Sequence, residues 1–403
     1  MKNRKISCAV VACAALGAGS VNAWAEDAGD QAAPPQSNAM AAPQMIGPLQ
    51  ANPNPYSYDF GGPVGKVYVT GVASGFGQLQ NNAYPGDPRH SQADISNAQV
   101  IVQKTDGLVQ FYAQAGAYSL PDLGVSYIRA SKVTDQFYGP LPVAYIKLAP
   151  TDSFSIQAGK LPTLIGAEVT FDFEDMNIER GLLWNQENAV NMGVQANYTQ
   201  GPLALSFALT DGFYSGKYSW LVGSAAYTFN ANNILTFIGG ANTETDTTNT
   251  LVTPVLLNNE QIYNLMYTYT SGPWTLMPYL QYTYVPKNIQ IGAAHDASTT
   301  AGAILTSYNF EPDFGLAGVS LPVRLEYISS SGSVADGAPN LMYGPGSNAW
   351  SVTVTPTYQR GIFFTRAELS YVGTSHTTPG AAFGSTGNDK SEIRGVFEGG
   401  VLF

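Results

Sequence analysis

The carboxyl-terminal segment places the strongest constraint on the fold. Apolar residues or glycines occupy every second position up to the last residue: Ile393, Gly395, Phe397, Gly399, Val401 and Phe403. The positions between them include Glu392, Arg394 and Glu398. A period of two indicates a β-strand with one apolar face and one polar face. A chain that ends inside such a strand on an aromatic residue is typical of a barrel whose last strand closes against its first. The signal formed by Phe397, Val401 and Phe403 therefore predicts a closed β-barrel.

The amino terminus predicts a cleaved secretory signal over residues 1–25. Lys2, Arg4 and Lys5 precede an apolar stretch, and residues 23–25 form a small-x-small cleavage site. The apolar stretch is too short for a transmembrane helix. Both cysteines, Cys8 and Cys13, lie inside this segment, so no disulfide is expected in the mature chain. Cys13 also loosely fits a lipoprotein cleavage box, which leaves lipidation as a less favoured alternative.

The composition of the remaining chain favours a large all-β membrane protein. Loss of the three signal cations from 18 Lys and Arg leaves 15 against 29 Asp and Glu, a formal net charge of −14. Such an acidic chain is not expected to bind nucleic acid. Charged residues make up only 12% of the sequence, and no stretch of about eighteen apolar residues follows the signal. A barrel in lipid needs few charges on its outer face, so both observations fit a transmembrane barrel.

Alternating segments recur along residues 64–403, and the connections between them are short and long by turns. We predict an antiparallel up-and-down barrel of about sixteen strands, with fourteen to eighteen left open. The expected strands are 66–78, 95–104, 108–118, 142–149, 153–160, 189–200, 203–210, 219–229, 234–242, 260–270, 274–285, 300–310, 319–328, 349–358, 362–372 and 391–403. Most are near the length that crosses a membrane at a tilt. Residues 26–63, rich in Ala, Pro and Gln, are expected to form a flexible tail.

The layout assigns side chains to two environments. Trp220, Trp274 and Trp350 lie at or near expected strand ends, which suits aromatic girdles, although each is equally compatible with an ordinary strand position. The polar faces carry mainly Gln, Asn, Ser, Thr and Tyr, as a water-filled lumen requires. Short turns and long loops on opposite sides place both termini in the periplasm.

The longest connection, residues 161–188, is the first candidate site. It carries a cluster of charges: Glu168, Asp172, Glu174, Asp175, Glu179 and Arg180. General porins fold their third external loop into the lumen as a constriction, and by resemblance this loop is expected to favour cations there. A solvated external loop is an equally supported alternative, since loop position alone is a weak signal.

Charges at spacing two on strands form a second candidate site, lining the lumen. This set is Lys147, Lys160, Arg324, Glu326, Arg366, Glu368, Arg394 and Glu398. Near the middle of the membrane, each would cost about 2–4 kcal/mol on the lipid face, which favours an inward orientation. The basic residues can either form a wall facing the acidic loop or pair with neighbouring acids. We favour pairing, because adjacent opposite charges mostly satisfy each other.

No feature of the sequence predicts an enzyme. His90, His295 and His376 all fall in expected external loops, without spacing typical of a metal or catalytic motif. We expect no catalytic residue, metal site or cofactor.

The centre of the chain resembles the putative β-barrel porin family (OmpL-like) of Gram-negative outer membranes. The resemblance rests on residues 158–168, on Asn177 and residues 179–182, and on 193–198, 201–203 and 210–213. It implies an outer-membrane porin whose solute is usually unassigned. From this we expect passive diffusion of small hydrophilic solutes with a weak cation preference. A non-conducting adhesin or structural anchor is the alternative.

Several partners follow from this interpretation. The chain is expected to contact outer-membrane lipid and lipopolysaccharide, and to be recognised by the barrel-assembly machinery through its carboxyl-terminal strand. Small hydrophilic solutes are the expected cargo, and a homotrimer is left open.

Overall fold

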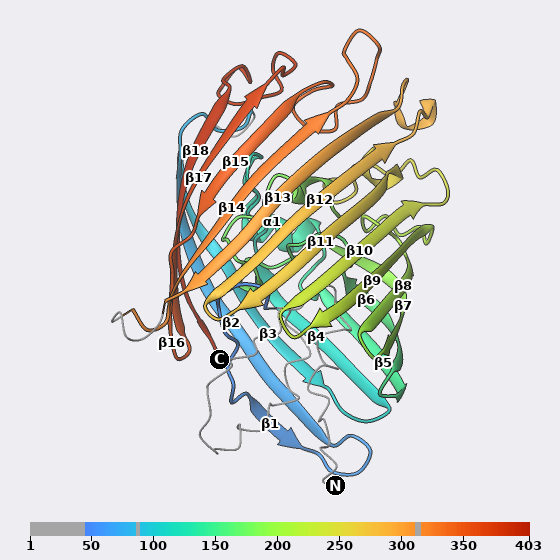
Figure 1. Ribbon diagram of the computed structural model, residues 1–403, viewed down its shortest axis with the longest axis vertical. Coiled ribbons are helices and arrows are strands. Elements are labelled where there is room, and N and C mark those ends of the chain that lie inside the picture. Colours follow the sequence, from blue (N-terminus) through green and yellow to red (C-terminus); the bar gives the residue numbers. More distant parts are fainter. Residues whose placement is uncertain (1–44, 86–88, 311–315) are drawn as a thin grey trace.

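A single sheet closes on itself into an antiparallel barrel of sixteen strands (Figure 1). The computed structural model describes residues 45–85, 89–310 and 316–403. The expected signal and residues 26–44 of the expected tail lie outside the described residues. Every neighbouring pair in the ring is antiparallel, and β10 pairs with β9 to complete the circle. The fold class predicted from the alternating pattern is therefore confirmed.

The strand positions follow the sequence pattern closely. From the amino terminus, the ring contains β2 (Lys66–Gln80), β3 (Ser91–Lys104), β4 (Val109–Tyr118), β5 (Val143–Thr151), β6 (Phe154–Pro162), β7 (Val190–Gln200), β8 (Leu203–Thr210), β9 (Trp220–Asn230), β10 (Asn233–Asn242), β11 (Gln261–Ser271), β12 (Trp274–Val285), β13 (Ala297–Asn309), β14 (Val319–Ser330), β15 (Asn348–Val354), β16 (Thr357–Arg360), β17 (Phe363–Ser375) and β18 (Ser391–Leu402).

One strand of the ring is interrupted. β15 and β16 both lie between β14 and β17, so together they occupy one position where the sequence predicts the single strand 349–358. Pro356 separates them, and proline has no backbone N–H to donate to the ladder. The Pro356 carbonyl still accepts a hydrogen bond of 3.0 Å from the Ala367 N–H. The break leaves the ring closed.

The carboxyl terminus seals the barrel. β18 pairs with β17 on one side and with β2 on the other. Beyond β18, the Phe403 N–H and carbonyl exchange hydrogen bonds of 2.9 and 2.8 Å with Gly71 of β2. Phe397 is 61% exposed on the outer face, which it shares with Val401, while Glu398 is fully buried on the inner face. The alternation in this segment therefore separates the outer surface from the lumen.

The tryptophans divide between these two environments. Trp274 and Trp350 are exposed on the outer face, where they are compatible with an aromatic girdle. Trp220 is fully buried and packs edge-to-face on Phe213 at 5.7 Å between ring centroids. The girdle expectation for Trp220 is wrong, because the register of β9 turns this side chain into the lumen beside Val222.

The connections hold the remaining regular elements. The helix α1 (Ala130–Gln136) lies between β4 and β5. Short 3₁₀ turns are η2 (Asp172–Glu174), η3 (Trp184–Gln186), η4 (Leu257–Asn259) and η5 (Ile289–Ile291). Among the described residues, no helix is both long and apolar enough to cross a bilayer.

Part of the expected tail is ordered. β1 (Tyr56–Asp59) pairs with the first residues of β2, ahead of the point where β18 begins to pair. Ile46, Gly47 and Leu49 are buried. The flexible tail expected over 26–63 thus differs over 45–63, because Ile46 and Leu49 provide apolar contacts and β1 has a strand partner.

Candidate functional site: a loop folded into the lumen

The connection between β6 and β7 lies inside the ring (Figure 1). Its residues bond to inward side chains of strands on opposite parts of the wall. Asn97 of β3 donates to Asp172 at 2.6 Å, and Gln281 of β12 donates to the Leu183 carbonyl at 3.0 Å. All six charged residues predicted as a constriction are less than 9% exposed. The loop is therefore packed against the wall and is not solvated outside the barrel.

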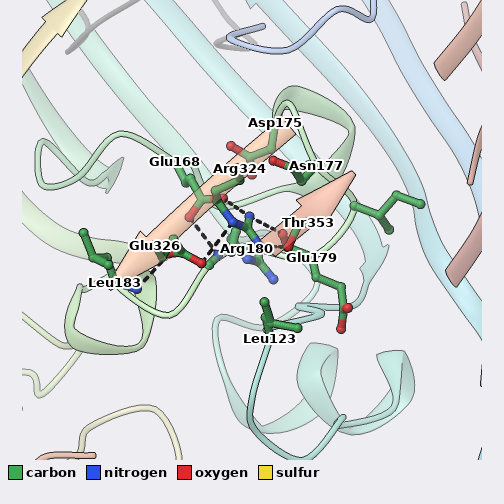
Figure 2. A network of polar contacts seen from close by, with 12 residues as sticks. Leu123, Glu168, Asp175, Asn177, Glu179, Arg180, Leu183, Arg324, Glu326 and Thr353 are labelled. Atoms are coloured by element: carbon green, nitrogen blue, oxygen red, sulfur yellow. Dashed lines mark hydrogen bonds and ion pairs between the residues drawn. The ribbon is translucent and has the colours of Figure 1, made fainter. Parts of the chain in front are cut away.

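Three arginines of the wall anchor the loop, and each contacts one carboxylate from the wall and one from the loop. The first is Arg324 of β14. Its Nη1 lies 2.6 Å from Glu168 Oε1 in the loop, and its Nε lies 3.1 Å from Glu326 Oε2 on the same strand (Figure 2). Glu326 also accepts a hydrogen bond from the Ser351 hydroxyl at 2.6 Å. The loop and the wall therefore share this guanidinium.

Arg366 of β17 likewise contacts one carboxylate of the wall and one of the loop. Its Nε donates to Glu398 Oε2 at 2.8 Å across the β17–β18 ladder, and its Nη2 lies 3.4 Å from Asp172 Oδ2 in the loop. Its Nη1 also donates to the Asp172 carbonyl at 2.9 Å. Burial raises the pKa of Asp172 to about 8, with the nearby Glu398 adding to the rise and Arg366 opposing it.

Arg394 of β18 completes the set. It pairs with Glu179 of the loop, and its Nη2 lies 3.0 Å from Glu392 Oε1 on its own strand. Its Nη1 further donates to the Asp122 carbonyl at 3.0 Å. The cross-strand pairing expected between Arg366 and Glu398 is thus present, and the loop supplies a second acid to each arginine.

A fourth wall residue holds the loop through its backbone. Glu368 of β17 accepts from the Ile178 N–H at 2.6 Å and from the Glu179 N–H at 3.2 Å. It also accepts from the Thr355 hydroxyl at 2.8 Å. These main-chain to carboxylate hydrogen bonds are charge-assisted, so Glu368 fixes the backbone of the loop at residues 178–179.

Arg180 ties two connections together. Its Nε lies 2.8 Å from Asp122 Oδ1 in the connection after β4, and its Nη1 donates to the Thr170 carbonyl. Its guanidinium is stacked over Trp184 at 5.2 Å from the ring centroid. Sequence reasoning did not select Asp122, since an isolated aspartate in a long loop carries no periodic signal.

The other side of the loop is apolar. Leu164, Ile165, Leu182 and Leu183 belong to one buried cluster with inward residues of β10–β13. Those wall residues are Ile238, Met266, Met277 and Leu305. The expectation of a polar lumen therefore fails on this part of the wall, because here the wall packs against the loop.

Glu187, at the end of the loop, has no arginine partner among the described residues. Its Oε1 accepts from the Tyr279 hydroxyl of β12 at 2.6 Å, and its Oε2 has no hydrogen-bond partner within the described part of the chain. Burial raises the pKa of Glu187 to about 8, which the Tyr279 hydrogen bond opposes.

The two predicted lysines lie on strands away from the arginine-rich wall. Lys147 of β5 shares the inner face with its cross-strand partners Gln110 and Gln157. Lys160 is on the opposite face, opposite Ala144 and Met192, and its Nζ donates to the Tyr138 carbonyl at 2.9 Å. The expectation that Lys160 lines the lumen is wrong, because β6 alternates without a break from Gln157.

Glu174 and Asp175 occupy the turn of the loop. Asp175 Oδ1 accepts from the Val169 N–H at 2.9 Å. The Glu174 carbonyl accepts from the N–H groups of Ile46 and Gly47, both at 2.9 Å. The Asp175 carboxylate therefore holds the loop turn, and the Glu174 backbone carbonyl holds its contact with the amino-terminal segment.

A sealed ring of antiparallel strands with a loop fixed inside it defines the class of outer-membrane β-barrels of the porin type. Residues 66–403 match the model of the family described as putative beta-barrel porin-2, OmpL-like, and the chain belongs to that family. The sequence resemblance found in the central segment is confirmed.

Solved structures share the fold at low identity. An anion-selective porin from Comamonas acidovorans is 11% identical, with a TM-score of 0.57, over 84% of this chain and 99% of that chain. The outer membrane channel DcaP of Acinetobacter baumannii is 11% identical, with a TM-score of 0.56, over 86% and 99%. OmpT of Vibrio cholerae, an outer membrane protein, is also 11% identical, with a TM-score of 0.56, over 86% and 99%. No curated protein matches the sequence.

Proposed function

We propose that the protein is a passive diffusion channel for small hydrophilic solutes, with a weak preference for cations. One observation carries the proposal: an acidic loop is anchored inside a closed barrel of the porin family. The loop has six carboxylates (Glu168, Asp172, Glu174, Asp175, Glu179 and Glu187) and one arginine, Arg180. Above about pH 8, where Asp172 and Glu187 are also ionised, three wall arginines offset only part of that charge. A negative excess at the narrowest point favours cations over anions.

A diffusion channel of this kind catalyses no reaction. It requires a water-filled path and a field, which a barrel of about sixteen strands can provide. The porin family supports a channel over an enzyme. The proposed channel needs no cofactor.

Reversal potentials across planar bilayers with a salt gradient test the cation preference. At pH 9, above the pKa of about 8 that burial gives Glu187, Glu187→Gln removes an ionised lumen carboxylate without leaving an arginine unpaired, so we expect a smaller cation preference with little change in folding. Asp336→Asn, in an exposed connection, is the matched control and should behave as the unaltered protein. Equal reversal potentials for the two variants would show that Glu187 does not contribute to the ion selectivity of the channel.

The alternative function, a non-conducting adhesin or anchor, is supported by a different observation. The loop and residues 46–49 are buried almost throughout, so both occupy the lumen. A barrel closed in this way would act through its external connections. Reconstituted protein that stays silent under voltage would favour this second function.

Export, assembly and association complete the proposal. We infer that residues 1–25 direct secretion and are removed, and that the barrel-assembly machinery recognises the strand ending at Phe403. The outer face is expected to contact lipid and lipopolysaccharide. One similar structure, OmpT of Vibrio cholerae, is described in a trimer form. A homotrimer of this chain can be tested by chemical cross-linking in native membranes.

A further inference from the structure

We propose that residues 45–50 form an internal plug that docks on the lumen loop from the periplasmic end and regulates access to it. This plug rests on the channel function proposed above and adds a regulatory segment to it. The sequence left the role of the amino-terminal tail open, and the contacts of this segment supply one.

The first contact joins the plug to the turn of the loop. Ile46 and Gly47 both donate their N–H groups to the Glu174 carbonyl at 2.9 Å. A Cβ added to Gly47 would lie 2.1 Å from the Asp175 carbonyl oxygen. The two backbones therefore approach so closely that only glycine fits at position 47.

The second contact places an apolar anchor in the wall of the lumen. Leu49 is fully buried in one cluster with inward residues from β2, β3 and β17, namely Val72, Ile101 and Phe364. Leu402 of β18 belongs to the same cluster. Docking of Leu49 thus covers apolar surface beside the seam where the barrel closes.

The third contact fixes the end of the plug at the rim. The Gln50 N–H donates to Gln359 Oε1 at 2.7 Å, and Gln359 Nε2 donates to the Gln50 carbonyl at 2.8 Å. Gln359 lies on β16, beside the short connection to β17. The chain then continues to β1, which pairs with the start of β2.

The three contacts described above involve backbone groups, an amide side chain and apolar side chains, whereas the loop itself is held by three shared guanidinium groups. A segment held by uncharged contacts can leave its site while the loop stays in place, because local opening costs less than disruption of the charged network. Release would free the Glu174 carbonyl and uncover the Leu49 cluster. We therefore expect the plug to be held less strongly than the loop.

Thiol accessibility tests docking without relying on conduction. Both native cysteines lie in residues 1–25, so a cysteine introduced into the full-length chain reports alone once the signal is removed. We expect Leu49→Cys and Ile46→Cys to react with a charged maleimide at least tenfold more slowly than the exposed control Asn54→Cys. Adding Gly47→Ala should restore fast labelling at both sites. Labelling of both sites at the Asn54→Cys rate would overturn the plug.

Single-channel recording then separates the plug from the proposed function. Gly47→Ala should increase the open probability or the conductance at least twofold relative to the unaltered chain, while Asn54→Ala should change neither. Protected cysteines with conductance that Gly47→Ala leaves unchanged would overturn regulation by the plug. Silence of every variant would instead contradict the channel function, while the labelling result would still decide whether the segment docks.

Discussion

At the residue scale, the lumen is organised by guanidinium groups that each serve two carboxylates. Arg324, Arg366 and Arg394 are essentially inaccessible to solvent. A buried charge is tolerated only when its partners are in place, since removal of one partner typically costs about 3–5 kcal/mol. The pairing therefore links the stability of the wall to the position of the loop.

This linkage predicts the effect of removing one guanidinium. Arg366→Gln leaves Asp172 and Glu398 facing each other inside the barrel, so we expect a loss of about 3 kcal/mol or more in the free energy of unfolding. Thermal unfolding in detergent micelles, followed by circular dichroism, measures the change. Arg360→Gln, at an exposed position on β16, is the control. Equal midpoints for the two variants would contradict a structural role for the Arg366 triad.

Glu187 gives a prediction for pH. Burial raises the pKa of Glu187 to about 8 in the folded protein, above the ordinary glutamate value of 4.5. The unfolded chain therefore releases this proton first as the pH rises. The contribution of Glu187 to stability is fully present below about pH 4.5 and is lost as the pH increases toward 8. The midpoint temperature of unfolding should therefore decrease as the pH is raised from 5 to 9. Glu187→Gln should reduce that decrease. A variant with an unchanged pH profile would exclude Glu187 as the source.

At the element scale, the strands could be predicted and the path of the connections could not. All sixteen expected strands coincide with strands of the ring, because a period of two is a local property of each segment. The interruption at Pro356 and the outward position of Lys160 could be found only from the pairing of the strands in the structure. The inward orientation of Trp220 likewise depends on the register of β9, which its place near a strand end does not reveal.

The loop shows why the site was harder to predict than the fold. Its acids were selected from their density, and its wall arginines from their spacing. Their pairing depends on a loop that turns inward, which no short-range pattern encodes. Asp122 and residues 45–50 carried no signal, since their role comes only from contacts between distant segments.

The anchored loop predicts the result of shortening it. Replacing residues 169–186 with a short Gly-Ser turn removes Asp172 and Glu179 but leaves each wall arginine at least one acid. We expect the barrel to fold and its single-channel conductance to increase several-fold. As a control, deletion of the exposed residues 334–337 in another connection should leave conductance unchanged. If both deletions behave alike, the loop does not set the narrowest point of the path.

At the scale of the whole molecule, closure of the sheet explains the composition. Lipid offers no hydrogen bonds, so every strand must have two neighbours, and the Phe403–Gly71 bonds provide the last pair of the ring. With the outer face apolar, most of the charge lies in the lumen and in the connections. The barrel therefore combines a mainly apolar outer face with a lumen rich in buried charged side chains.

The most direct measurement is the current carried by the purified protein in planar bilayers under a salt gradient. We expect discrete ohmic steps with a reversal potential of the sign that denotes cation preference. A preparation that folds and inserts but remains silent would contradict the channel function. A preparation that conducts anions in preference to cations would contradict the proposed cation preference.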